Sequence, residues 1–229
     1  MKIGVLCAMA EELATLKAAL QQSQTRDVHG MTFYEGQLGK ADVVLVESGI
    51  GKVQAGLTTA LLIAVFNAEV VINSGSAGGI GDGLRVGDVV LSTQTAYHDV
   101  DARAFDYAYG QLPGQPTRFD ADPDWLAKLS DAATTTGLTV REGLIVTGDQ
   151  FIASKAAVSA ILDHFPDALS SEMEGAAVGQ VAHQFGVPYV VVRAMSDVGD
   201  EDAGVSFDEF IVEAGKQSAA MLLSLFETL

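Results

Sequence analysis

The sequence predicts an α/β protein in which helices cover both faces of a largely parallel sheet. Runs of β-branched and apolar residues that end in Gly or Ser alternate along the chain with segments of helical periodicity. Two of these runs, Val70–Asn73 and Tyr189–Met195, are almost continuously hydrophobic, which is typical of strands buried on both faces. The length of 229 residues suits a single domain, residues 1–229.

Strands are expected where short runs rich in Val, Ile and Leu lie between turn residues. Seven such runs occur, at Lys2–Leu6, Thr32–Leu38, Asp42–Ser48, Val70–Gly75, Asp88–Ser92, Leu144–Thr147 and Tyr189–Ala194. The second and third runs are close enough in sequence to form a hairpin, so the sheet is predicted to be mixed.

Helices are expected between these strands and after the last one. Their periodic segments are Glu11–Ala19, Lys52–Phe66, Pro123–Thr136, Lys155–His164, Glu174–Phe185 and Phe207–Thr228. Pro123 suits the first turn of its helix, and Pro188 suits the turn that follows the fifth.

The composition excludes several classes of protein. Hydrophobic residues make up 48% of the chain and charged residues 19%, a balance too apolar for disorder and too interrupted by charge for a membrane protein. The opening MKIGVLCAMAEEL holds neither a signal-peptide core nor the roughly 20 apolar residues that span a bilayer. We therefore expect a soluble, cytoplasmic protein.

Charge and metal-ligand content narrow the possible partners. The net charge of −17 argues against binding to nucleic acid or an anionic membrane, because both need a basic face. A single cysteine, Cys7, excludes an internal disulfide and a cysteine-rich zinc site. The four histidines lack zinc spacing, and the acidic segment SDVGDEDAG misses the EF-hand pattern. We predict a neutral or cationic small ligand and no metal.

Two glycine-rich segments resemble nucleotide-binding loops but depart from their patterns. The segment GSAGGIGDG at 75–83 lacks the G-x-G-x-x-G spacing and runs into another strand, and GIGK at 49–52 is followed by Val53 where a phosphate loop needs Ser or Thr. Gly75–Gly79 is either a plain turn or a place where backbone N–H groups approach a ligand closely.

Polar or glycine-rich segments follow four of the predicted strands. They are AMAEE at 8–12, GSAGG at 75–79, GDQFI at 148–152 and the pair Ser196–Asp197. Ligands of open α/β sheets bind outside the carboxyl ends of the strands. The four ends are therefore predicted to form one pocket.

Carboxylates are concentrated at these strand ends. Glu12 follows the first strand and Asp197 the last, while Glu172 and Glu174 lie at the start of a helix. The positive end of a helix dipole would account for Glu172 or Glu174 as simple capping residues, but it does not account for Glu12 and Asp197. In a shared pocket, burial and mutual repulsion would separate their pKa values and give distinct acid and base roles.

Six motifs together resemble one enzyme family. They are AMAEE at 8–12, SGIGKV at 48–53, NSGSAGG at 73–79, GLIVTGDQFI at 143–152, SEMEGAA at 171–177 and RAMSD at 193–197. Over essentially its whole length the chain is similar to the 5′-methylthioadenosine/S-adenosylhomocysteine nucleosidases. EMEGAA and the SD pair are shared with the wider nucleoside phosphorylase superfamily, whereas AMAEE is more discriminating. The resemblance implies a three-layer αβα sandwich with a twisted mixed central sheet, a homodimer and no cofactor.

The resemblance also implies a hydrolase that cuts the N-glycosidic bond of adenine thionucleosides and releases adenine. It assigns Glu12 to the attacking water, Asp197 to a proton transfer toward purine N7, and Glu174 to the ribose hydroxyls. Within this pattern Arg193 and Ser76 lie near the water, Met173 against the sugar, Phe151 against adenine, and the backbone of Ile152 at the edge of adenine. Further pocket positions that match are Ala8, Met9, Ile50, Gly78, Glu172, Ser196 and Phe207.

A neighbouring subunit is expected to lend a loop to the pocket. The matching positions are Ala102, Phe105, Tyr107 and Pro113. This chain departs from the common pattern with Ala102 in place of a larger Val, and with Ala10 and Gly199 where another acid and Ala are frequent. The short Ala102 side chain would reach less far toward a 5′ substituent.

Three other functions share the predicted pocket. They are a phosphorylase that uses phosphate as nucleophile, a nucleoside-binding protein without turnover, and a futalosine-type nucleosidase with a different 5′ tail. Related phosphorylases carry an arginine where this chain has Asn73, which leaves Arg85 as the one cation able to replace it. Because a phosphate dianion needs several donors at one place, water is the predicted nucleophile.

Overall fold

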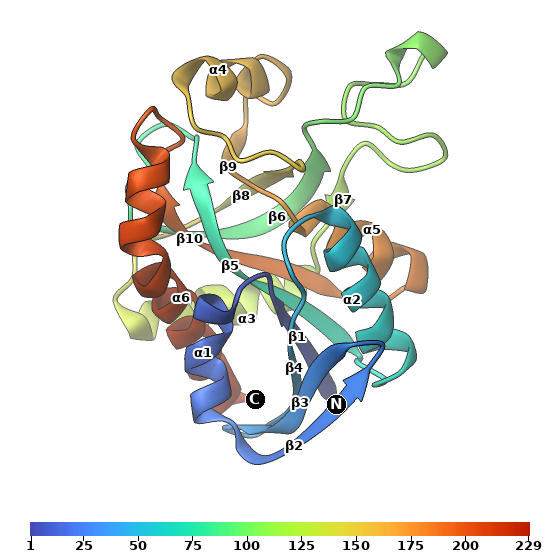
Figure 1. The fold of residues 1–229 in the computed structure, drawn as a ribbon, viewed down its shortest axis with the longest axis vertical. Coiled ribbons are helices and arrows are strands. Elements are labelled where there is room, and N and C mark those ends of the chain that lie inside the picture. The colour runs from blue at the N-terminus through green and yellow to red at the C-terminus, as the bar shows by residue number, and fades with distance from the viewer.

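The computed structural model describes residues 1–229 as a mixed α/β fold (Figure 1). The strands are β1 (Lys2–Cys7), β2 (Gln21–Val28), β3 (Met31–Leu38), β4 (Ala41–Glu47), β5 (Val70–Gly79), β6 (Val89–Tyr97), β7 (Phe119–Asp120), β8 (Val140–Thr147), β9 (Ala168–Glu172) and β10 (Tyr189–Asp197). The helices are α1 (Ala10–Ala19), α2 (Lys52–Ala64), α3 (Pro123–Thr136), α4 (Lys155–His164), α5 (Gly175–Phe185) and α6 (Ala203–Thr228), with a 3-10 helix η1 (Arg103–Phe105).

The seven predicted strands and six predicted helices are all present, and α3 and α4 have the predicted bounds. Sequence patterns missed β2, β7 and β9. The β2 segment QQSQTRDV is polar and almost entirely exposed, so it has no apolar alternation. The β9 segment ALSSE is short and mostly polar although it is largely buried. Both strands form because a neighbouring strand supplies hydrogen-bond partners, which a local pattern does not reveal.

The sheet has an open part and a closed part. In the open part β1 lies parallel to β4 and β5, and the antiparallel strands β3 and β2 continue beyond β4. In the other part β5 pairs with β10, β10 with β6, β6 with β8, β8 with β9, and β9 again with β5. These five strands form a closed ring.

This ring is where the structure departs from the expected three-layer sandwich, while the mixed α/β fold is confirmed. Long strands make the closure possible. β5 pairs with β1 only through its first residues, Val70–Asn73, with β10 from Val71 to Gly78, and with β9 only through Gly78 and Gly79 at its end. Register shifts in β10 and β6, at Met195/Asp197 and Ser92/Gln94, are irregularities of the kind that bend strands.

Helices pack on the sheet in two groups. α1 and α3 both contact α6 on one side, and α2 and α5 pair on the other (Figure 1). The main hydrophobic core of 49 buried residues lies between these helices and the strands. A second, smaller core of seven buried residues, including Ile80, Leu144, Ile161 and Phe165, lies beneath α4. α4 is therefore supported by a separate cluster at the edge of the sheet.

The segment between β6 and β7 extends away from the rest of the molecule and carries η1 at its far end (Figure 1). Phe105, the last residue of η1, is 76% exposed. None of the helices combines the length and the apolar character needed to cross a membrane.

Candidate active site

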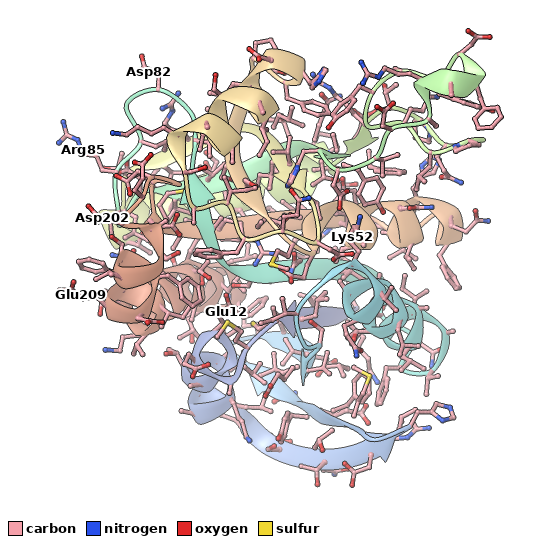
Figure 2. All side chains as sticks on the ribbon, turned by 45° about the horizontal axis from the view of Figure 1, so that its top comes forward. Glu12, Lys52, Asp82, Arg85, Asp202 and Glu209 are labelled. Carbon is pink, nitrogen blue, oxygen red and sulfur yellow. The ribbon has the colours of Figure 1, made fainter.

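A cavity of about 560 Å³ lies where β1, β5, β9 and β10 end. Its lining contains fourteen of the residues predicted for the pocket: Ala8, Met9, Glu12, Ile50, Ser76, Gly78, Phe151, Ile152, Glu172, Met173, Glu174, Ser196, Asp197 and Phe207. The structure thus confirms that the predicted strand ends converge. Figure 2 shows Glu12 near the middle of the molecule, whereas Arg85 points outward from the loop after β5.

Glu12 is fixed by four hydrogen bonds. Its Oε2 accepts from the backbone N–H groups of Ala8 at 3.0 Å and Met9 at 3.2 Å, and its Oε1 accepts from Ser76 N and Ser76 Oγ, both at 2.8 Å. The side chain bends back over the start of α1 and joins the end of β1 to β5. With 2% of its surface exposed, Glu12 has a defined orientation at the cavity wall.

Arg193 lies behind the cavity and is fully buried. Its Nη2 donates to Asn73 Oδ1 at 2.6 Å, to Glu174 Oε2 at 3.2 Å and to Glu172 Oε2. Burial alone would lower the pKa of Arg193, but the surrounding carboxylates Glu172, Glu174 and Glu12 raise it above its ordinary value. The arginine therefore stays charged and holds two acidic residues together.

Gly75 leaves room for this arrangement. A Cβ atom at position 75 would collide with Nη1 of Arg193 and would lie 2.7 Å from Oε1 of Glu12. Nη1 and Nε of Arg193 have no hydrogen-bond partner in the protein. Close approach is thus the reason for this glycine, and the alternative of a plain turn is wrong, since residues 70–79 form β5.

Glu172 is occupied by structural bonds. Its two carboxylate oxygens accept from the N–H groups of Glu174 and Gly175 at 2.8 to 3.0 Å, and also from Thr147 Oγ1 and Arg193. The N–H groups belong to the start of α5, where a carboxylate satisfies donors that the helix leaves free. The capping interpretation is correct for Glu172.

Glu174 is also buried, but its carboxylate accepts fewer hydrogen bonds than that of Glu172. Its Oε1 accepts from Gly51 N at 2.8 Å and its Oε2 from Arg193 at 3.2 Å. Burial raises the pKa of Glu174 to about 7, with Arg193 opposing the shift and Glu172 adding to it. Gly51 has φ of +98°, a backbone conformation that glycine tolerates, and this conformation directs its N–H toward Glu174.

Asp197 closes the other side of the cavity at the end of β10. Its Oδ1 accepts from Gly199 N at 2.9 Å, and its Oδ2 accepts from Ser196 Oγ at 3.0 Å. Burial raises the pKa of Asp197, and the bonds from Gly199 and Ser196 offset part of the effect. A Cβ at Gly78 would lie 2.8 Å from Oδ1, so only glycine fits opposite this carboxyl.

The remaining walls are apolar. Phe151 and Phe207 meet edge to face with ring centroids 5.7 Å apart, and Ile50 lies at the opening with 54% of its surface exposed. The full lining of the cavity holds no Lys, Arg or His. The cavity can therefore accept a flat, uncharged ring between aromatic groups and carboxylates.

Sequence analysis missed some lining residues, namely Ala77, Ile80, Gln150, Ser171, Gly199, Gly204 and Asp208. Ala77 and Gln150 lie next to predicted positions and follow from them. Gly204 and Asp208 line the cavity in the first turns of α6, which begins at Ala203, earlier than predicted, because the preceding polar residues show no helical periodicity. No group of three or more His, Cys, Asp or Glu side chains is placed to hold a metal ion.

The loop positions Ala102, Phe105, Tyr107 and Pro113 do not line the cavity of their own chain. They belong to the segment that projects from the body (Figure 1). Their contribution to a neighbouring subunit's pocket stays a prediction.

The fold and the carboxylates at its strand ends belong to a known class of protein. The model of the family described as the phosphorylase superfamily matches residues 2–227. A 5′-methylthioadenosine/S-adenosylhomocysteine nucleosidase of Actinobacillus succinogenes is 46% identical over 229 residues, which cover 100% of both chains. The chain belongs to the family of these nucleosidases.

Solved structures agree with this assignment. The S-adenosylhomocysteine nucleosidase of Streptococcus pyogenes, in complex with 5-methylthiotubericidin, is 46% identical with a TM-score of 0.97, and the match covers 100% of this chain and 97% of that one. The futalosine hydrolase of Helicobacter pylori is also similar, at 34% identity and a TM-score of 0.95, over 100% of this chain and 98% of that chain. The fold is thus common to S-adenosylhomocysteine nucleosidase and futalosine hydrolase.

Proposed function

We propose that this protein hydrolyses the N-glycosidic bond of 5′-methylthioadenosine and S-adenosylhomocysteine and releases adenine and the 5-thioribose product. The main support is the placement of Glu12 and Asp197 on different walls of one cavity, each with its own set of hydrogen-bond donors. Nucleosidases of this name are 46% identical over the full length. The rival futalosine hydrolase is 34% identical.

The chemistry explains why two such carboxyl groups are needed. The bond breaks through a transition state with positive charge on the sugar and growing negative charge on adenine, which leaves poorly unless protonated. Asp197 is the acid. Its raised pKa keeps a proton available to higher pH than an exposed aspartate would. Phe151 stacks on the adenine ring and the Ile152 backbone binds its edge.

Glu12 is the base on the opposite side of the sugar. Its four donors fix the carboxylate as an acceptor, and it orients the water that attacks the anomeric carbon. Nη1 and Nε of Arg193 have no hydrogen-bond partner in the protein, and Nη1 lies on the same side of Gly75 as Oε1 of Glu12. Glu174 binds the ribose hydroxyls and places an acceptor beside the developing positive charge.

A homodimer completes the pocket in this proposal. The Ala102–Pro113 loop of one subunit covers the 5′ tail in the other, with Phe105 as its main apolar contact. An exposed apolar stripe supports such a contact, since Val53 and Leu57 lie one turn apart on α2 and are 80% and 48% exposed. The stripe starts beside Ile50 at the cavity opening. Sedimentation that finds an active monomer at working concentration would refute the dimer.

A phosphorylase activity is less well supported. Asn73, which stands at the arginine position of related phosphorylases, accepts a bond from Arg193, and Arg85 is exposed and absent from the cavity lining. A phosphate dianion, which needs several donors at one place, would therefore meet no Lys, Arg or His side chain in the cavity lining.

Product analysis in phosphate-free buffer tests the proposal. The enzyme should release adenine and free methylthioribose at full rate, and added phosphate should neither speed the reaction nor enter the product. Formation of a ribose 1-phosphate analogue would show a phosphorylase. Relative rates on methylthioadenosine, S-adenosylhomocysteine, deoxyadenosine and aminofutalosine would identify the 5′ tail that the enzyme prefers.

A further inference from the structure

A cluster of charged residues lies beside the cavity without lining it. Lys52 Nζ donates to Asp99 Oδ2 at 2.6 Å and lies 3.8 Å from Asp149 Oδ2. Lys52 is the first residue of α2, Asp99 follows β6 and Asp149 follows β8. Figure 2 shows Lys52 at the start of α2, on the side of the molecule away from Asp202, which precedes α6, and from Glu209 of α6.

The Lys52–Asp99 pair of this cluster is less exposed than the ion pairs elsewhere in the chain outside the Arg193 group. The side chains of Lys52 and Asp99 are 22% and 12% exposed, whereas those of Lys155 and Glu201, for example, are 80% and 64% exposed. Exposed pairs contribute little, because solvent screens them and ordering long side chains costs entropy. A partly buried pair is screened less and can hold its neighbours in position.

Backbone groups take part in the cluster as well. Lys52 N donates to Asp149 Oδ1 at 2.9 Å, and Asp149 N donates to Asp99 Oδ2 at 2.9 Å. A Cβ at Gly51 would lie 3.0 Å from Asp149 Oδ1, so the two loops approach closely at this glycine. Three segments that are distant in sequence are thus joined through main-chain and side-chain bonds.

Each of the three segments serves the pocket in a different way. Gly51, next to Lys52, donates its N–H to Glu174. Phe151, two residues beyond Asp149, forms an aromatic wall of the cavity. Asp99 stands at the base of the projecting loop that carries Phe105. The relative placement of these segments therefore depends on the charged cluster that joins them behind the cavity.

We propose that Lys52, Asp99 and Asp149 are positioning residues that hold the ribose-facing turn, the adenine-facing loop and the base of the projecting loop in one arrangement. The expected effect of these residues on catalysis rests on the proposed function, whereas their effect on the placement of the three segments does not. Loss of the cluster lets the Gly51 turn and the Phe151 loop move independently. Small displacements of this kind lower the rate of a reaction that depends on accurate placement of its groups.

A double-mutant cycle tests the cooperation of the pair. Lys52→Met and Asp99→Asn should each lower kcat/KM for methylthioadenosine about tenfold, and the double variant should lose no more than either single one. Lys52→Arg keeps the charge and should recover most of the activity. The matched control is Lys2→Met, which removes a partly buried Lys2–Glu35 pair of 3.1 Å that lies outside the cavity lining. Losses that multiply, or an equally large loss in the control, would overturn the proposal.

Hydrogen exchange in the substrate-free protein tests the structural part separately. In Lys52→Met the amides of residues 49–51, 148–151 and 99–105 should lose protection together, while β1 and β5 keep theirs. Unchanged exchange in these segments would overturn the proposal, and so would a uniform rise over the whole chain. If Lys52→Met does not fold, Asp149→Asn replaces it, because Asp149 has a half-exposed side chain. An inactive wild-type enzyme with the expected exchange pattern would count against the proposed function alone.

Discussion

The floor and the mouth of the cavity are built in opposite ways. At the floor Glu12, Glu172 and Arg193 are buried, and each carboxylate oxygen has a partner within the same chain. At the mouth Ile50 and Phe151 are about half exposed, and nothing in the chain covers them. The floor is complete in one chain, whereas the mouth needs a ligand or a second subunit. Under the proposed function the ribose and the attacking water therefore meet groups that are already fixed, whereas Phe151, which stacks on adenine, and the groups around the 5′ tail are still to be covered.

Replacing the acid at the floor should give the largest effect. Asp197→Asn should lower kcat about 10³-fold, since the amide is too weak an acid to protonate the leaving adenine. Because burial raises the pKa of Asp197, the wild-type enzyme should lose activity as the pH rises through that pKa. The variant should keep a low rate that lacks this decline, as measured by adenine release between pH 5 and 10. Normal adenine release by the variant would remove Asp197 from the mechanism.

Replacing the base comes next. Glu12→Gln should lower turnover by about 10² while nucleoside binding stays nearly unchanged, because the side chain keeps its shape but loses its charge. Glu11→Gln is the matched control, since Glu11 is the neighbouring acid on α1 and is exposed. Calorimetric binding and single-turnover adenine release would separate the two effects. Near-normal turnover in Glu12→Gln would exclude Glu12 as the base.

Titration of Glu174 should make the free energy of unfolding of the substrate-free protein depend on pH. Its pKa is about 7 when folded, above the ordinary 4.5, so the folded protein keeps a proton that the unfolded chain releases in that range. The free energy of unfolding should therefore fall as the pH rises from about 4.5 to 7. Relative to wild type, Glu174→Gln should gain about 1–3 kcal/mol between pH 5 and 8. Urea unfolding at both pH values measures this, and Glu209→Gln, at an exposed position of α6, is the control. An equal difference at both pH values would contradict the assignment.

Changes at the mouth should be smaller and selective. Phe105→Ala should raise KM about tenfold for substrates with bulky apolar tails and much less for adenosine, because in the proposed dimer the phenyl ring packs on the tail and not on the purine or the ribose. Steady-state kinetics on both substrates would measure the difference. Equal effects on the two would assign Phe105 to subunit packing only.

Much of the fold follows from local patterns. The alternation of strands and helices and the bounds of α3 and α4 depend on periodicity, turn residues and proline placement, which act between neighbours in the sequence. The pocket at the strand ends was predictable because ligands of α/β sheets bind outside the carboxyl ends of the strands, and polar residues follow four of the predicted strands. These features needed no knowledge of the sheet order.

The tertiary structure decided which groups meet. Residues 51 and 174, or 12 and 76, are far apart in sequence, and nothing local to either indicates the hydrogen bond between them. The same holds for the closure of the sheet at Gly78–Gly79 and for the polar strand β2, which forms only because β3 pairs with it. The sequence by itself determined the six helices, seven of the ten strands, the family and the carboxylates at the strand ends. Only the packed structure assigned Glu172 to capping and left Glu174 for the cavity, because burial and hydrogen-bond partners depend on contacts across the whole chain.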